Sequence, residues 1–431
     1  MNCIPSLKVG ALGAIVLLLA ACGTQVADPD APADPLRYRV EYVVTANPAH
    51  GTVTVSMRVA QSRSLLRQLT MRFDDRVSDL EADGDLTIEQ GRARWTPREF
   101  GGTLSWTVKV AHRRNGDGYD SYLGADFGLF RAEDIIPRAA SRTLKGAQGE
   151  TWLRFMLPGT WSAVTQYFDD NGRIRVDNPE RRFDQPTGWI VAGDLGVRRE
   201  EIAGMRVAVA GPVNHNVRRM DTLAMLNWTL PELGRILPEL PPRLTIVSAG
   251  DPMWRGGLSA PQSLFLHADR PLISENGTST LLHELMHMSL GITASKGYDW
   301  IVEGLAEYYS LQLLLRSGTI SETRYAAARA HLADWALQAD TLCKPYSSGS
   351  TTALAVGILA SLDEEMRKAT DGEHNLDDAV RALFDAGGRT DVAALAAAVE
   401  QATGNKPDTL HSSNLPGCRN IAGESSASQA H

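Results

Sequence analysis

Cysteine is scarce in this chain of 431 residues, which has four, two of them within the first 22 positions. The fold therefore cannot depend on a framework of several disulfides. Long basic runs are absent too, and the formal net charge is −8 at pH 7. Because nucleic-acid binding needs a concentrated positive surface, we expect no nucleic-acid partner. The sequence also shows no internal repeat.

A long apolar run is missing as well. The stretch from Val9 to Ala21 is too short to span a bilayer comfortably, and Lys8 places a positive charge just before it. Residues 1–22 therefore have the pattern of an export signal, which is a targeting segment and no part of the fold.

The end of this apolar stretch carries a second motif. Leu19-Ala20-Ala21-Cys22 resembles the lipobox that bacteria cleave before the cysteine and diacylate on its thiol. The resemblance implies a lipidated Cys22 as the membrane anchor, and Gly23 after it implies sorting to the periplasmic face of the outer membrane. The alternative, a plain secretory signal with an incidental cysteine, also takes the chain out of the cytoplasm.

The exported part divides into segments by composition. Residues 23–36 are rich in Ala, Asp and Pro and are expected to form a flexible tether, while residues 406–431 form a polar C-terminal tail. The residues between them suffice for two or three domains with real cores. From 37 to 213 apolar residues alternate with polar ones, as in Val53, Val55 and Met57, which predicts an antiparallel β-sandwich-like domain.

The pattern changes to helical spacing near Asn214. Residues 214–405 are therefore expected to form a mainly α-helical domain, which makes the whole chain α+β. Within it, Thr278 or Ser279 can cap a helix that ends at Gly291. His283 and His287, four residues apart, lie on one face of that helix and can share one metal ion.

A glutamate follows the first of these histidines, and two more lie downstream. Glu284 is suited to take a proton from a metal-bound water. Glu303 completes a site of two histidines and one glutamate with a fourth position left for water, which is typical of a single catalytic Zn²⁺. Glu307 is placed to accept the outer N–H of a liganding histidine, with an ordinary surface glutamate as the alternative. The small Gly304 is expected to allow close packing against the motif helix.

These motifs resemble those of the gluzincin metallopeptidases. His283 to His287, with the later Trp300 to Tyr309, is similar to the branch that holds glycyl aminopeptidases and larger aminopeptidase-like enzymes. The resemblance covers roughly 244–404 and implies a β-rich domain before a thermolysin-like catalytic domain, with peptides or proteins as substrates. It also implies that Tyr346, which begins a Tyr-x-x-Gly motif, donates its hydroxyl to the oxyanion; an ordinary packed tyrosine is the alternative.

The chain departs from that branch in two places. Only fifteen residues separate His287 from Glu303, so the connection must be tight. The segment 256–262 also lacks an acid where the family has Gly-x-Met-Glu-Asn, whose glutamate captures a free amine. Aminopeptidase and endopeptidase activity are therefore both open. The continuation from Ser263 to Ala268 is expected to pair with substrate backbone as an added strand.

Two further expectations concern cysteines and function. Cys343 and Cys418 are expected to form a disulfide, with two free buried thiols as the alternative. The function expected is zinc-dependent peptide hydrolysis in the cell envelope. Its rivals are a non-catalytic zinc-fold lipoprotein that binds a peptide or protein partner, and a zinc hydrolase acting on another substrate. His267 and His331 are interpreted as structural or surface histidines.

Overall fold

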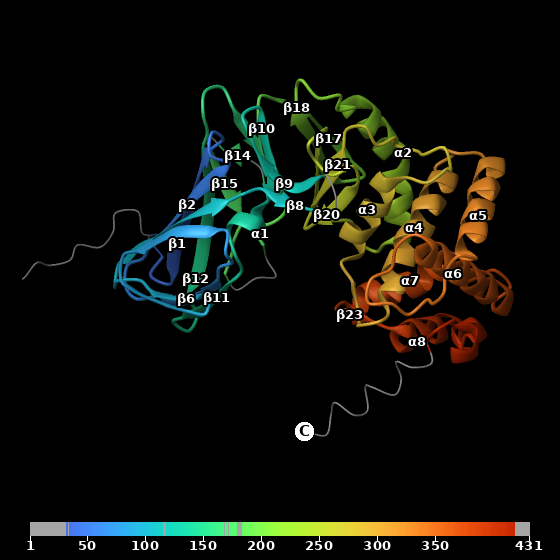
Figure 1. Ribbon diagram of the computed structural model, residues 1–431. Coiled ribbons are helices and arrows are strands. Elements are labelled where there is room, and N and C mark those ends of the chain that lie inside the picture. The colour runs from blue at the N-terminus through green and yellow to red at the C-terminus, as the bar shows by residue number, and fades with distance from the viewer. Residues whose placement is uncertain are drawn as a thin grey trace, which may run out of the picture.

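The computed structural model describes residues 32, 34–114, 118–167, 169–170, 172–178 and 183–418 (Figure 1). The expected signal segment, Cys22, most of the expected tether and the last part of the expected tail lie outside the described residues. No helix in the described ranges is long and apolar enough to cross a membrane.

The N-terminal half contains two β-sheets that share one core. Alternate residues of β1, such as Tyr38, Val40 and Tyr42, are fully buried and pack with Leu69 and Trp95 of the second sheet. The seven-stranded sheet has the order β14 (Asp169–Asp170), β15 (Arg173–Val176), β12 (Gln148–Met156), β1 (Arg37–Asn47), β2 (Thr52–Ala60), β7 (Gly101–Lys109), β4 (Val77–Ala82). The four-stranded sheet has the order β11 (Ala139–Thr143), β3 (Leu66–Arg72), β6 (Arg92–Thr96), β5 (Asp85–Glu89).

The sandwich departs from a purely antiparallel arrangement at one place. β1 pairs with β2 antiparallel but with β12 in parallel, with Arg37 opposite Gln148. Between these two parallel strands the chain crosses to the other sheets and returns, which gives the long connection that parallel neighbours require. The predicted period-two pattern therefore identified the strands but not this pairing.

A third sheet joins the two halves of the molecule. Buried Phe127, Trp189 and Val191 of this sheet form a common core with Val247 and Phe265 of the next one. The five strands have the order β13 (Ser162–Val164), β16 (Trp189–Gly193), β10 (Phe127–Arg131), β9 (Tyr119–Leu123), β8 (His112–Arg113), and the short α1 (Ala132–Ile135) follows β10.

The sheet of the helical half is mixed and takes strands from both sides of residue 214. β18, β19 and β21 are parallel, and β17 and β20 pair antiparallel at its two edges. All residues of β19 are buried, as expected for a central strand covered on both faces. The order is β17 (Leu195–Ile202), β18 (Met205–Pro212), β19 (Arg243–Ala249), β21 (Ser263–His267), β20 (Gly257–Ala260).

This strand order corrects one expectation. The segment Ser263–His267 is not free to receive a substrate strand, because its backbone is already paired with β19 on one side and β20 on the other. The edge is instead formed by β20, which a tight turn at Pro261 connects to β21. On this side of the sheet, an added strand could pair along β20 and not along β21.

The remaining elements are helices that cover the mixed sheet and one another, at the right of Figure 1. Helix α4 is buried on nearly all sides, and α3 and α6 pack against it. The helices are α2 (Arg219–Ile236), α3 (Thr280–Leu290), α4 (Asp299–Arg316), α5 (Glu322–Ala336), α6 (Ser350–Ala369), α7 (Leu376–Ala386), α8 (Val392–Thr403). Short elements complete this half: β22 (Thr293–Ala294), β23 (Arg389–Thr390), η1 (Asp408–Leu410), η2 (Ser412–Asn414).

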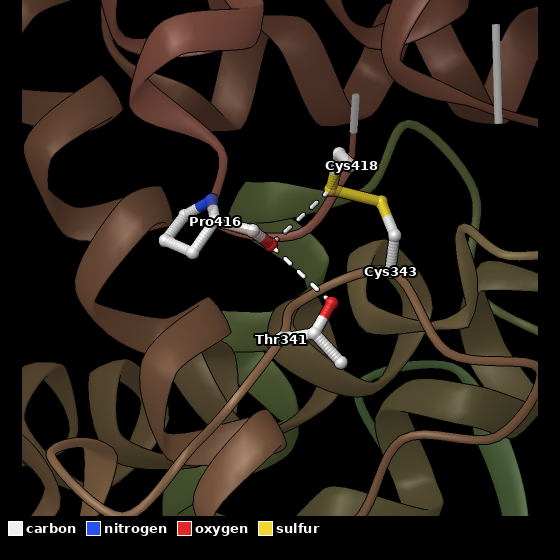
Figure 2. Close-up of a disulfide and its surroundings, with 4 residues drawn as sticks. All are labelled: Thr341, Cys343, Pro416 and Cys418. Carbon is white, nitrogen blue, oxygen red and sulfur yellow. Dashed lines mark hydrogen bonds between the residues drawn. A yellow bond between two sulfur atoms is a disulfide. The ribbon is translucent and has the colours of Figure 1, made fainter. Parts of the chain in front are cut away.

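A disulfide joins Cys343 to Cys418 (Figure 2). Cys343 lies in the connection between α5 and α6, and Cys418 follows η2 near the end of the described chain. The carbonyl of Pro416 accepts hydrogen bonds from the amide of Leu342 at 2.9 Å and from the hydroxyl of Thr341 at 3.5 Å. The C-terminal segment is therefore fastened to the α5–α6 connection by covalent and polar contacts.

Candidate metal centre

The motif helix α3 begins and ends where its sequence predicts. The Ser279 hydroxyl accepts a hydrogen bond from the amide of Leu282 at 3.3 Å, which caps the N-terminus. Gly291 ends the helix in the left-handed conformation, with φ of 61°. Between these caps His283 and His287 lie one turn apart, with their ring centroids 4.7 Å from each other.

Helix α4 brings Glu303 to both imidazoles. Its carboxylate oxygens lie 3.3 Å from Nε2 of His283 and 3.4 Å from Nε2 of His287. The two Nε2 atoms are 3.1 Å apart. Among the residues that the structure describes, these three form the one group of histidine, cysteine, aspartate or glutamate side chains able to hold a metal ion together.

The spacing of these atoms fits zinc. Nitrogen and oxygen ligands lie about 2.0–2.2 Å from Zn²⁺, so neighbouring ligand atoms of a tetrahedral site are about 3.3 Å apart. The three separations here, from 3.1 to 3.4 Å, match that value. Two imidazoles and one carboxylate are a donor set that zinc accepts, and they leave a fourth position open.

Glu307 lies one helical turn beyond Glu303 and contacts the back of the first histidine. Its carboxylate is 2.9 Å from Nδ1 of His283. An ionised carboxylate can only accept, so Nδ1 carries a proton, and Nε2 is the nitrogen left to ligate a metal ion. The contact therefore fixes both the tautomer and the orientation of this imidazole.

The electrostatics of the cluster favour a cation at its centre. Burial disfavours a charged His283, but hydrogen bonds to Glu303 and Glu307 outweigh it and hold the pKa of this imidazole well above its usual value. Burial likewise opposes a charged Glu303, but hydrogen bonds from both histidines lower the pKa of that carboxyl. Positive charge is thus stabilised where the three side chains meet, which is what a metal ion would supply.

Gly304 does not face the motif helix, contrary to expectation. A Cβ added there would lie 2.7 Å from Cβ of Ala355 on α6. Adjacent helical positions are about 100° apart, so when Glu303 and Glu307 point towards α3 the residue between them turns to another neighbour. The missing side chain therefore makes room for α6, while α3 packs against another face of α4.

Glu284 follows the first histidine on α3 and lines a cavity of about 430 Å³ beside the cluster. Its carboxylate forms no hydrogen bond or ion pair with any residue in the described ranges. A Cβ added at Gly257, the first residue of edge strand β20, would lie 3.0 Å from Cγ of Glu284. Glu284 therefore lines the same cavity as the metal cluster, beside the first residue of β20, without a hydrogen-bond or ion-pair partner in the described ranges.

The cavity has walls from several elements, and most of their residues were not identified from the sequence. Trp254, before β20, and Trp335, on α5, contribute indole rings. The loop between β21 and α3 contributes Arg270. His331, which we interpreted from the sequence as a structural or surface histidine, also lines the cavity and lies on the exposed helix α5.

The N-terminal half holds one of these walls in place. The amide of Trp254 donates to the carbonyl of Tyr119 at 2.8 Å, and the amide of Tyr119 donates to the carbonyl of Pro252 at 3.1 Å. The guanidinium carbon of Arg114 lies 4.5 Å from the centre of a Trp254 ring. A Cβ added at Gly118 would lie 2.4 Å from Cα of Trp254, so only glycine permits this approach.

Tyr346 is not brought to the site. Its side chain is 85% exposed, and the neighbouring Ser348 and Gly349 line the cavity in its stead. The connection is anchored beside it by the amide of Ser347, which donates to Asp299 at the start of α4 at 2.6 Å. The oxyanion role that the resemblance assigned to Tyr346 therefore has no support from its position.

No family model matches the sequence, and no curated protein matches it either. Solved structures do resemble the fold. An aminopeptidase N family protein from Idiomarina loihiensis matches with a TM-score of 0.60 and 18% identity, over 80% of this chain and 70% of that one. An M1 zinc metallopeptidase from Deinococcus radiodurans, crystallised as a variant with the substrate Tyr-Ser-Ala, matches with a TM-score of 0.54 and 18% identity, over 86% and 91% of the two chains.

A third similar structure is yeast LTA4 hydrolase, with a TM-score of 0.52 and 15% identity over 84% of this chain and 64% of that one. Identities this low carry information about architecture and not about substrate. The α+β arrangement of sheets followed by a helical half is thus found in known zinc metallopeptidases. The chain has the fold of the M1 zinc metallopeptidases.

Proposed function

We propose that this protein is a zinc-dependent peptidase. The observation that carries the proposal is the convergence of His283, His287 and Glu303 at zinc-ligand spacing, with the unpaired carboxylate of Glu284 beside them in a cavity. The fold shared with zinc metallopeptidases supports it. A protein that kept the fold only to bind a partner would have no use for a free base beside the cluster.

The residues divide the chemistry as follows. Zinc bound by the three ligands would act as a Lewis acid that polarises the scissile carbonyl and makes a water molecule more acidic. Glu284 takes the proton from the attacking water and delivers it to the leaving amine. Glu307 keeps the imidazole of His283 in the tautomer that ligation needs. Edge strand β20 offers backbone groups along which an extended peptide can lie.

Replacement of Glu284 by Gln tests the assignment. This variant keeps the size and the metal ligands but cannot accept a proton, so we expect one equivalent of bound zinc and hydrolysis of a mixed peptide library reduced by about 10²–10⁴-fold. Zinc content is measured by atomic emission and cleavage by mass spectrometry. A chelator should abolish wild-type cleavage and added zinc should restore it. Full activity in the variant would refute the role of Glu284.

The proposal includes a place in the cell envelope. Its support is the sequence of the first 23 residues, where Cys22 follows Leu-Ala-Ala. Mass spectrometry of the mature protein from a Gram-negative host is expected to find a diacylated Cys22 at the N-terminus. An unmodified N-terminus beyond position 22 would show a plain secretory signal instead.

A further inference from the structure

Each carboxylate among the described lining residues of the cavity already has a role in the proposed mechanism, which leaves none for a substrate's free amino terminus. The acidic residues among its described lining are Glu284, Glu303 and Glu307. Glu303 contacts both histidines and Glu307 contacts His283, while Glu284 is the proposed base. A substrate ammonium group that bound to any of them would compete with zinc or with proton transfer.

The cavity does offer a cation. Arg270 is the single arginine or lysine among its described lining residues. The backbone of Arg270 is fixed on both sides, since its amide donates to the carbonyl of His267 at 3.0 Å and its carbonyl accepts from the guanidinium of Arg218 at 2.7 Å. The held backbone fixes where this side chain begins, so a bound ligand has to order the side chain of Arg270 but not the loop that carries it.

The guanidinium of Arg270 has no partner in the described chain. No hydrogen bond, ion pair or ring contact joins it to another described residue. The adjacent Asp269 forms no ion pair with it; that carboxylate lies 3.7 Å from Arg255 and 3.9 Å from His267. By contrast, Arg255 is paired with Asp251 at 2.7 Å. The unpaired cation is therefore the one that faces the cavity.

We propose that Arg270 selects substrates that carry a carboxylate near the scissile bond, either an acidic side chain or a free C-terminus. A guanidinium binds a carboxylate through two parallel hydrogen bonds, and it repels a free amino terminus. The inference rests on the proposed peptidase function and adds its substrate class. An acidic side chain and a free C-terminus present the same carboxylate group to the guanidinium of Arg270.

Matched peptides separate the two sources. One set, blocked at both ends, places Glu or its neutral isostere Gln at each position around a single cleavable bond; a second set compares a free C-terminus with its amide. We expect wild-type kcat/KM to be about tenfold higher for at least one carboxylate-bearing member of a pair. In Arg270→Gln the ratio should fall to within about twofold, mainly through KM, while bound zinc stays at one equivalent.

Arg255→Gln serves as the control, because it removes the same charge from a paired arginine outside the lining, and the wild-type preference should persist in it. Equal cleavage of both members of every pair by the wild type, or a preference retained in Arg270→Gln, would overturn the inference. If no peptide is cleaved, the proposed peptidase function is refuted, and this result does not yet decide the role of Arg270. Titration of zinc-loaded Glu284→Gln with the same peptides then still measures whether carboxylates bind more tightly, and equal binding refutes the inference.

Discussion

Two walls of the same cavity are built in different ways. The wall formed by α3 and α4 comes from buried, closely packed helices, and its ligand atoms already have the separations that zinc requires. The wall at the α5–α6 connection is exposed, and Tyr346 on it points to solvent. Helix packing thus holds the candidate metal ligands in place, whereas the second wall is a loop fastened at Ser347 and Cys343.

The largest effect is expected on the helical wall, from Glu303→Ala. Loss of a direct ligand should weaken zinc binding by more than about 100-fold, since loss of a mere supporting contact already costs about 10–100-fold. Peptide cleavage should disappear with the metal. Competition with a zinc chelator of known affinity measures the change. Glu400→Ala, on the exposed face of α8, is the control and should bind zinc as the wild type does.

A smaller loss is expected from Glu307→Gln. The amide still offers an oxygen to Nδ1 of His283 but lacks the charge, so zinc affinity should fall by about tenfold. The same chelator competition measures it. If this variant bound zinc as tightly as the wild type, Glu307 would not support the metal site. The alternative stated from the sequence, an ordinary surface glutamate, would then hold.

Gly118→Ala tests the wall that the N-terminal half supports. The added methyl group would meet the backbone of Trp254, so this wall must shift, and we expect KM for peptides to rise about three- to tenfold with zinc content unchanged. Gly357→Ala is the matched control, because a Cβ there meets no atom within 4 Å and the position is helical. Equal KM values in the two variants would show that the contact of the N-terminal half with Trp254 does not influence substrate binding.

The smallest effect is expected from Tyr346→Phe. With its side chain 85% exposed, removal of the hydroxyl should leave kcat within about twofold of the wild type. Steady-state kinetics with a peptide that the wild type cleaves efficiently measures kcat for both proteins. A loss of more than about tenfold would mean that the loop brings this hydroxyl to the reacting atoms when substrate binds, as the resemblance implied.

The helical wall could be predicted because its geometry is local. A spacing of four residues places His283 above His287 on any helix, and the same spacing links Glu303 to Glu307. Capping at Ser279 and termination at Gly291 are also short-range signals, and the structure confirms both. Helical and strand periodicity likewise gave the α+β class and the boundaries of α3.

The errors came where the outcome depends on distant packing. Which helix meets Gly304 depends on the rotation of α4 in the assembled bundle, and which strand forms the sheet edge depends on the final strand order. Trp254 and Arg270 lie outside any local motif and reach the cavity only through the path of long loops. No spacing rule in the sequence could have placed them.

The disulfide between Cys343 and Cys418 makes a covalent ring of the chain from one cysteine to the other, which contains α6, α7 and α8. By the chain-entropy estimate, closing a ring across 75 residues restricts the unfolded chain enough to contribute about 4 kcal/mol to stability. A protease that cuts once inside the ring leaves both pieces joined. The helices α6, α7 and α8 thus stay attached to the rest of the protein after a single nick.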